Sequence, residues 1–158
     1  MDSLATALVL GRVVEAQSSV DGLKARLQRL DRPVGIETDW IQIASPMAGP
    51  KAGFSFMPEP GDVAVVAFTG RRAIILGFIY AGGAETFEDG AEKRLIASRD
   101  GNALILTDGD ESGITLKDKH GNEITMTADG ISIKTGKDLT IEAAGTTTIK
   151  GATVELNP

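Results

Sequence analysis

The last third of the chain repeats a short pattern in which two apolar residues flank one polar residue. A period of two is typical of β-strands, in which successive side chains point to opposite faces. Asp100-Gly101-Asn102 is echoed twenty residues later by His120-Gly121-Asn122, which indicates stacked units of one strand and one turn. The apolar positions expected to point inward are Leu104, Leu106, Ile114, Leu116, Ile124, Met126, Ile131, Ile133, Leu139, Ile141, Ile149, Val154 and Leu156.

A single unit of this repeat cannot form a core, because it contributes only two apolar side chains. The units must therefore stack, and two apolar side chains per unit are few for a solenoid made by one chain. We expect several identical chains to wind around one axis, with the apolar positions at the centre. Gly101 and Gly121 each precede Asn and begin a unit, which predicts a tight turn with positive φ at each glycine.

The first half of the chain contains β-forming segments separated by turn sequences. Residues 69–72 predict a hairpin turn between the last two segments, and Pro58-Glu59-Pro60-Gly61-Asp62 predicts a turn before them. A loop rich in Pro and Gly is expected over 45–53. The predicted strands are residues 7–15, 40–43, 63–68 and 73–80.

Residues 23–29 fit two kinds of structure. Apolar and polar residues alternate from Leu23 to Leu27, as in a half-exposed strand. Leu23, Leu27 and Leu30 also have the spacing of one helix face, with Asp21 available as an N-cap. The pattern alone leaves this segment undecided. Counted as a strand, it gives five strands in about 75 residues, which favours a small, partly closed barrel of the OB type.

The sequence changes character near residue 84, which predicts two domains within the 158 residues. Nineteen glycines and few aromatic residues favour a turn-rich β protein over a helical bundle. We therefore expect an all-β protein with an N-terminal OB-fold barrel over 1–83, a linker over 84–97 and a C-terminal intertwined trimeric β-helix over 98–158.

Charge and composition argue against several functions. The net charge of −6 disfavours nonspecific binding to nucleic acid or to anionic lipid. The chain has no cysteine and one histidine, so the usual nucleophile, general-base and metal constellations are missing from a single chain. We expect no catalytic residue, no cofactor and no metal ion. The sequence contains no apolar run near the roughly 20 residues that span a bilayer.

Several features have both a functional and a structural interpretation. His120 from three chains could converge on one ion, but its Lys-His-Gly-Asn context favours an exposed turn. The acidic run 108–111 lacks the remaining ligands of a calcium loop, which favours a solvated turn. Trp40 could stack on a base, yet a core or interface position fits the negative charge better. A basic patch that either docks a partner or protects strand edges would contain Arg26, Arg29, Arg32, Arg71 and Arg72.

A series of motifs runs along the first half of the chain: Gly11-Arg12-Val13-Val14, Trp40-Ile41-Gln42-Ile43-Ala44, Ala48-Gly49 with Gly53, Pro58-Glu59-Pro60-Gly61-Asp62-Val63 and Ile75-Leu76-Gly77-Phe78-Ile79-Tyr80. This series resembles the OB-fold of phage baseplate assembly protein V and of the related valine-glycine repeat spikes of contractile injection systems. Residues 96–102 and the repeats behind them resemble the β-helical needle of those spikes. The resemblance covers nearly the whole chain and implies that residues 23–29 are a strand.

The resemblance implies a non-enzymatic, homotrimeric spike at the tip of a tail tube, which docks on a baseplate hub and pierces the target membrane. It implies assembly in the cytoplasm as part of a phage tail or a tail-like injection particle. Valine-glycine repeat spikes carry hub domains before the barrel, so a separate hub protein is expected here. The 84–97 stretch is too short for the lysozyme domain of some phage spikes, and the C-terminus lacks the His-x-His that binds iron at some tips.

Two contact sites with other proteins are expected. Arg71 and Arg72, or the loop 45–57, should dock on the hub. Related spikes carry a small conical tip protein with Pro-Ala-Ala-Arg repeats (PAAR-type), and the resemblance implies one at the blunt C-terminal end of this chain. Its contact residues would be Val154, Leu156, Asn157 and Pro158.

Two other functions are compatible with a β-rich repeat protein. The first is an OB-fold binding module for nucleic acid or oligosaccharide on a repetitive β stalk, which a basic, aromatic-rich groove would favour. The second is a β-helical enzyme acting on polysaccharide, which needs paired carboxylates at a defined separation. The sequence shows neither feature.

Overall fold

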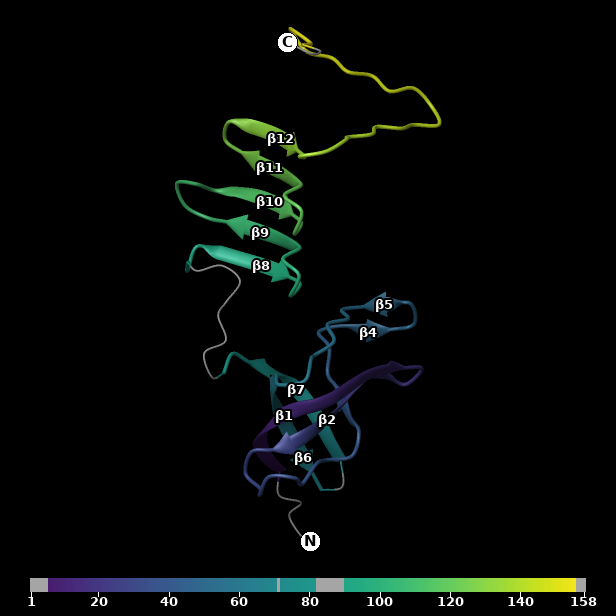
Figure 1. Cartoon of the computed structure of the whole chain (residues 1–158), viewed down its shortest axis with the longest axis vertical. Helices are drawn as coiled ribbons and strands as arrows, with labels where there is room; N and C mark the ends of the chain where they lie inside the picture. Colours follow the sequence, from purple (N-terminus) through teal and green to yellow (C-terminus); the bar gives the residue numbers. More distant parts are fainter. Residues whose placement is uncertain (1–5, 71, 82–89, 156–158) are drawn as a thin grey trace. The chain divides into compact units, whose positions relative to one another are not determined.

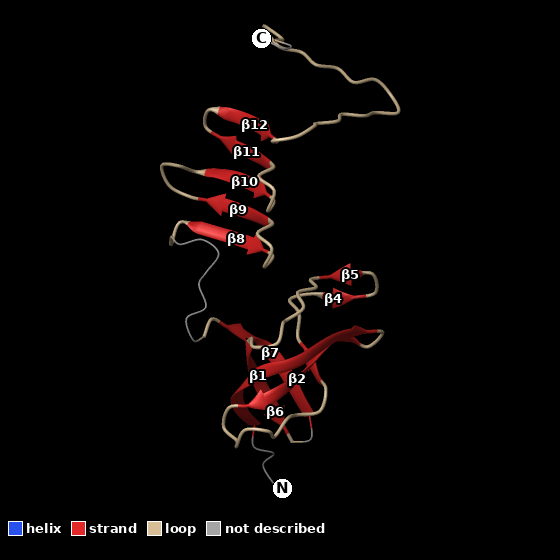
Figure 2. Ribbon diagram, in the orientation of Figure 1, coloured by secondary structure: helices blue, strands red, loops and turns tan. Residues whose placement is uncertain are grey.

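The computed structural model describes residues 6–70, 72–81 and 90–155, and it divides the chain into two compact units, Met1–Thr86 and Phe87–Pro158. Both units are built from β-strands (Figures 1 and 2). The described residues contain no helix with the length and apolarity that crossing a bilayer requires. The all-β prediction is therefore confirmed.

The first unit is a closed five-stranded barrel with the strand order β1-β2-β3-β7-β6. Neighbouring strands run antiparallel, except that β3 pairs in parallel with β7. This order confirms the predicted OB-type barrel and shows that residues 23–29 are a strand. The barrel strands are β1 (Thr6–Ser19), β2 (Gly22–Arg29), β3 (Ile41–Ile43), β6 (Val63–Thr69) and β7 (Arg72–Ile79).

The long strand β1 closes the barrel because its two halves pair with different neighbours. Its first half pairs with β6 and its second half with β2, and Gly11 has a partner on both sides. A side chain at Gly11 would place its Cβ 3.1 Å from the Cβ of Leu27 in the barrel interior. Glycine therefore lets β1 cross close over the core at the point where it changes partner.

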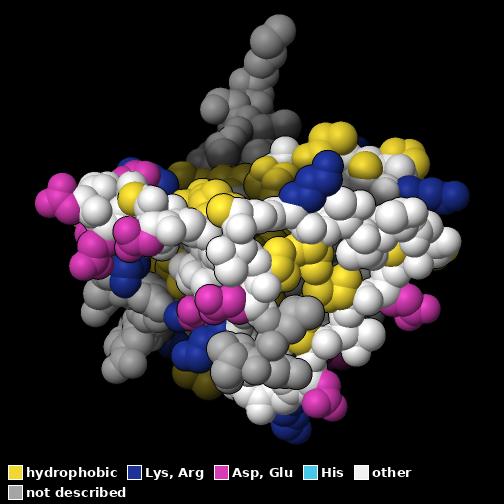
Figure 3. Space-filling model, turned by 90° about the horizontal axis from the view of Figure 1, so that it is seen from above, with side chains coloured by type: hydrophobic (Ala, Val, Ile, Leu, Met, Phe, Trp, Pro, Cys, Tyr) yellow, Lys and Arg dark blue, Asp and Glu magenta, His cyan; other side chains and the backbone are white. Residues whose placement is uncertain are grey.

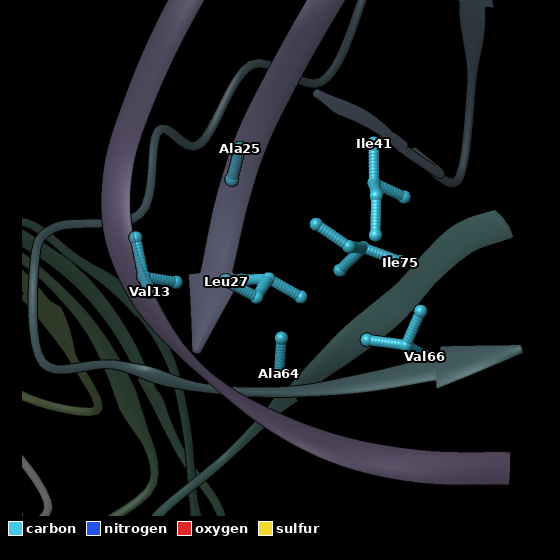
Figure 4. Packing of buried hydrophobic residues seen from close by; sticks show 7 residues of the cluster. All are labelled: Val13, Ala25, Leu27, Ile41, Ala64, Val66 and Ile75. Carbon is cyan, nitrogen blue, oxygen red and sulfur yellow. The ribbon is translucent and has the colours of Figure 1, made fainter. Parts of the chain in front are cut away.

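The barrel has a compact apolar core. Alternate residues of the strands point inward, so that short apolar runs such as Val63 to Phe68 place every second side chain inside. Figure 4 shows the buried side chains facing one another between the strands. They are Val13, Ala25, Leu27, Ile41, Ala64, Val66 and Ile75.

The predicted loop over 45–53 contains a small hairpin of its own. Its strands are β4 (Ala48–Gly49) and β5 (Ala52–Gly53), and the Ser45 hydroxyl lies within 2.9 Å of the Met47 carbonyl oxygen and 2.8 Å of that of Phe54. A Cβ at Gly53 would lie 2.6 Å from the Met47 carbonyl oxygen, so the close approach of the two arms requires glycine there.

The second unit is a five-stranded antiparallel sheet in which each strand pairs with the next one along the chain. The expected positive φ is confirmed at Gly101 (91°) and Gly121 (84°). The strands are β8 (Lys93–Ala97), β9 (Ala103–Thr107), β10 (Gly113–Lys117), β11 (Glu123–Thr127) and β12 (Gly130–Lys134).

Three features of this sheet differ from the prediction. First, β8 lies inside the segment assigned to a linker, because Lys93–Ala97 finds a complete ladder partner in β9. Second, β8 to β12 pair within the chain, because tight turns reverse the chain after each strand. The apolar repeat had predicted strands that wind around neighbouring chains. Third, residues 135–155 form no strand in the single chain. A segment without a neighbouring strand cannot pair its backbone groups in a ladder.

Candidate functional site: the apolar face of the C-terminal sheet

One face of the C-terminal sheet carries two rows of apolar side chains. Residues directly opposite each other in antiparallel strands lie on the same face, so the register defines each row. The first row consists of Ile96, Leu104, Leu116, Ile124 and Ile133. The second row consists of Arg94, Leu106, Ile114, Met126 and Ile131.

Eight of the predicted inward positions thus lie together on one face of one sheet. Sequence reasoning missed Ile96, because that residue lies inside the predicted linker. A signal was present, since Ile96 precedes Gly101-Asn102 by the same spacing as Leu116 precedes Gly121-Asn122. The repeat therefore begins one strand earlier than the alternation alone indicated.

The apolar face is largely open to solvent in the single chain. The exposed fractions of Ile131, Ile133 and Leu116 are 71%, 57% and 52%. Figure 3, which colours the surface of the whole molecule by side-chain type, shows hydrophobic side chains exposed among charged and polar groups. Among residues 90–155, only Ala103 and Ile105 are buried apolar residues, so the sheet has hardly any core of its own.

The opposite face of the sheet is polar along most of its length. Its middle row continues from Leu95 and Ile105 to Thr115, Thr125 and Ser132. A second row ends in Lys117, Glu123 and Lys134. The sheet is therefore amphipathic, with one face suited to solvent and one to burial.

Arg94 is the charged member of the apolar face. It stands at the end of its row, where it forms an ion pair with Asp108 and donates a hydrogen bond of 3.0 Å to the Glu92 carbonyl oxygen. These contacts hold the guanidinium at the rim of the face. The charge thus leaves the apolar rows uninterrupted from β9 to β12.

Burial of the apolar face would stabilise an assembly substantially. Complete burial of a large aliphatic side chain contributes about 1.5–3 kcal/mol, so covering a half-exposed one contributes on the order of 1 kcal/mol. Nine large apolar side chains line the two rows, and seven of them are at least 40% exposed. Exposed apolar patches of this kind mark interaction sites in soluble proteins.

The remaining predicted inward residues lie in the segment after β12. Leu139, Ile141, Ile149 and Val154 are all at least half exposed there, and no ladder places them on a common face in the single chain. Leu156 lies outside the described residues, as do Asn157 and Pro158 of the predicted tip contact.

His120 and the acidic run 108–111, the two candidate ion-binding features of the sequence, lie in turns of the sheet. His120 is exposed, and its backbone N–H donates to the Asp118 carboxylate at 2.8 Å. Residues 108–111 form an exposed turn in which Asp108 pairs with Arg94. Among the described residues, no group of three or more His, Cys, Asp or Glu side chains is placed to hold a metal ion.

Two of the basic residues predicted for a cationic patch on the barrel form ion pairs with neighbouring carboxylates. Arg26 pairs with Glu37 at 2.8 Å, and Arg29 pairs with Asp31 at 2.6 Å. The Arg29 guanidinium holds the pKa of the Asp31 carboxyl below its ordinary value, mainly through their hydrogen bond. Arg72 is exposed at the start of β7, while Arg71 lies outside the described residues.

A groove on the barrel adjoins the β4–β5 hairpin. Its volume is about 670 Å³, and the hairpin arms and strands β3 and β7 form its walls. Ile43, Met47, Phe54 and Ile74 give these walls an apolar character. Trp40 lies outside the core cluster, with 36% of its surface exposed.

Comparisons with known proteins match the two units to two protein-family descriptions. Residues 9–80 match the type VI secretion system/phage-baseplate injector OB domain. Residues 93–158 match the phage baseplate V C-terminal trimerisation domain, and this match begins at the first residue of β8. A comparison with curated proteins gave no significant match.

Proposed function

Because this chain belongs to the phage baseplate V family of injection-machinery spikes, we propose that it forms a homotrimer in which three C-terminal sheets turn their apolar faces toward one axis. The observation that carries the proposal is the pair of apolar rows on one face of a domain matched to a trimerisation family. A single copy leaves these rows in water. Three copies around an axis cover them all.

The segment 135–155 would extend this assembly. Its extended chain has exposed apolar residues, among them Ile141 and Ile149, but no ladder partner in the single chain. In the proposed trimer, equivalent segments from three copies supply one another with backbone partners and wind around the same axis. Their apolar side chains continue the dry interior that the sheets begin.

This assembly would act as the central spike at the tip of the tail tube. Rigidity is its mechanism, because paired backbone and a packed interior resist bending under load. The barrel would seat on a separate hub protein, and the needle would transmit force to the target membrane. The family is structural and generally non-enzymatic, and no catalytic step is assigned to this chain.

The mass of the protein in solution tests the trimer. We expect static light scattering of the full chain to give three times the chain mass of 16.5 kDa, and to keep that value on dilution to low micromolar concentration. Assembly should persist because the apolar face has no alternative cover within the described residues. A folded monomer under these conditions would contradict the proposed function.

A further inference from the structure

The groove beside the β4–β5 hairpin is lined by three parts of one barrel unit, and we call it the hairpin groove. Strands β3 and β7 contribute Ile43 and Ile74, and the end of the β1–β2 hairpin contributes Asp21 and Leu23. The β4–β5 hairpin forms the remaining side, and Figure 1 shows both hairpins projecting from the same side of the barrel. With a volume of about 670 Å³, the groove has the size of known ligand sites and accommodates several side chains at once.

The apolar side chains of the hairpin groove are open to solvent in the single chain. Met47 and Phe54 are each 53% exposed and Ile74 is 42% exposed, and none of the three belongs to the barrel core cluster. A backbone hydrogen bond of 3.0 Å from the Phe54 N–H to the Met47 carbonyl oxygen joins the two arms of the β4–β5 hairpin. The hairpin thus presents Met47 and Phe54 on a fixed backbone, which lowers the entropy cost of binding to them.

Lys51, at the tip of the β4–β5 hairpin, has a backbone conformation that favours glycine. Its φ is +60°, and it follows Pro50, whose ring fixes a negative φ. A turn with these two φ values is of type II, which favours Gly or Asn at the position that Lys51 occupies. Glycine fills the other positive-φ positions of the described residues, so Lys51 is their one exception. A strained residue at an exposed tip points to a role for its side chain.

The Lys51 ammonium is also the unpaired charge of the hairpin groove. Asp21 and Lys51 are the two charged residues that line it. The Asp21 carboxylate pairs with the Lys24 ammonium at 3.1 Å, whereas the Lys51 side chain forms no ion pair or hydrogen bond with any residue that the structure describes. A cation beside apolar side chains complements a carboxylate that has apolar neighbours. One cation on a chain of net charge −6 does not match the repeated charges of a nucleic acid.

We infer that the hairpin groove binds a short peptide segment of a partner protein, one that carries apolar side chains and a carboxylate. The apolar side chains of the peptide pack on Met47, Phe54 and Ile74, and its carboxylate pairs with the Lys51 ammonium. This pairing accounts for a lysine at a position where glycine would be less strained. All residues of the groove belong to one barrel unit, so the inference goes beyond the proposed function and does not depend on the trimer.

Selection from a library of short random peptides, with the full-length protein as bait, tests the inference. We expect the bound peptides to be enriched in Leu, Ile or Phe together with Asp or Glu. The most enriched peptide is then synthesised with a fluorescent label, and its Kd is measured by anisotropy. We expect Lys51→Gln to raise this Kd about fivefold, as loss of an exposed ion pair predicts. Arg32→Gln removes an exposed charge elsewhere on the barrel and should leave the Kd unchanged.

A glycine variant separates binding from folding. Lys51→Gly removes the ammonium and relieves the positive φ, so we expect it to fold normally and to bind the peptide as weakly as Lys51→Gln does. Equal Kd values for wild type and Lys51→Gly, or selection of no peptide beyond those that a Lys51→Glu bait selects, would overturn the inference. Binding of a single-stranded oligonucleotide that Lys51→Gln abolishes, with no peptide selected, would assign the groove to nucleic acid instead. Light scattering of the same variants reports separately on the trimer.

Discussion

Two turns of the C-terminal sheet have the same construction but different first residues. In the first, the Ser98 hydroxyl accepts hydrogen bonds from the backbone N–H and the side-chain amide of Asn102. In the second, the Asp118 carboxylate accepts the corresponding bonds from Asn122, at 3.0 and 2.7 Å. These bonds hold the pKa of Asp118 below its ordinary value, the side-chain bond from Asn122 having the largest effect. One turn therefore depends on an ionised group and the other does not.

This difference predicts a pH dependence of stability. A depressed pKa means that Asp118 stabilises the folded protein above the ordinary carboxyl pKa of about 4, and that this contribution is lost as the pH falls through the lower folded value. We expect Asp118→Ser, which reproduces the first turn, to unfold at a lower temperature than wild type at pH 6. The gap should narrow at pH 3. A gap of equal size at both pH values would contradict this role of the carboxylate.

In the C-terminal sheet, strands β10 to β12 carry apolar side chains on one face and polar side chains on the other. On β12, Ile133 belongs to the apolar face and its neighbour Ser132 to the polar face. We expect Ile133→Asp to prevent assembly, because a trimer would bury three like charges near one axis. Ser132→Asp adds the same charge on the other face and should leave the trimer mass unchanged. Light scattering checks both variants, and a normal trimer from Ile133→Asp would show that this face is not the interface.

The segment after β12 gives a parallel prediction. Ile141→Asp should also prevent assembly if this segment winds around the same axis, and light scattering measures the outcome.

The sequence predicted the strands well where local pattern decides the structure. β-forming segments between turn sequences predicted the barrel strands other than residues 23–29, and the two Gly-Asn pairs predicted turns with positive φ. The helical spacing of Leu23, Leu27 and Leu30 was overridden by tertiary pairing, since β2 has strands on both sides. Whether residues 135–155 form strands could not be predicted from the sequence, because a strand there depends on pairing partners that local pattern does not specify.

The apolar face could be predicted in part. Period-two alternation identifies which residues share one side of each strand, so eight members were found from sequence. Whether the strands pair within one chain or between chains depends on turn geometry and long-range register. Ile96 and the strand that carries it were missed because they lie inside the segment predicted as a linker. The direction in which each side chain of β6 points could not be predicted either, because a strand that is apolar on both faces has no alternation of apolar and polar residues.

At the scale of the whole molecule, the barrel is expected to dock on the hub. Arg72 begins β7, and Arg71 lies outside the described residues. The groove beside the 45–57 loop offers a second contact. We predict that changing both arginines to Glu weakens co-purification with the cognate hub, because the reversed charge repels a surface that complements arginine. Arg32→Glu is the control for charge elsewhere on the barrel. Unchanged binding by an intact trimer would place the interface elsewhere.

The other end of the assembly is expected to carry a tip protein. Val154 is half exposed in the single chain, and exposed apolar side chains in a patch mark interaction sites. We predict that a PAAR-type protein co-purifies with the wild-type spike from the native assembly and is lost when residues 152–158 are deleted. Equal recovery of the tip protein with the deletion variant, or no recovery of it with the wild type, would contradict this prediction.

Thiol labelling of β12 tests the central claim most directly. Ile131 and Ser132 are neighbours on opposite faces, and Ile131 is 71% exposed in the single chain. We predict that a maleimide reacts slowly with Ile131→Cys in the native protein and rapidly with Ser132→Cys. After unfolding, the two rates should be equal. Fast labelling of Ile131→Cys in a protein whose trimer mass is intact would show that the apolar face remains in solvent, and would contradict the account.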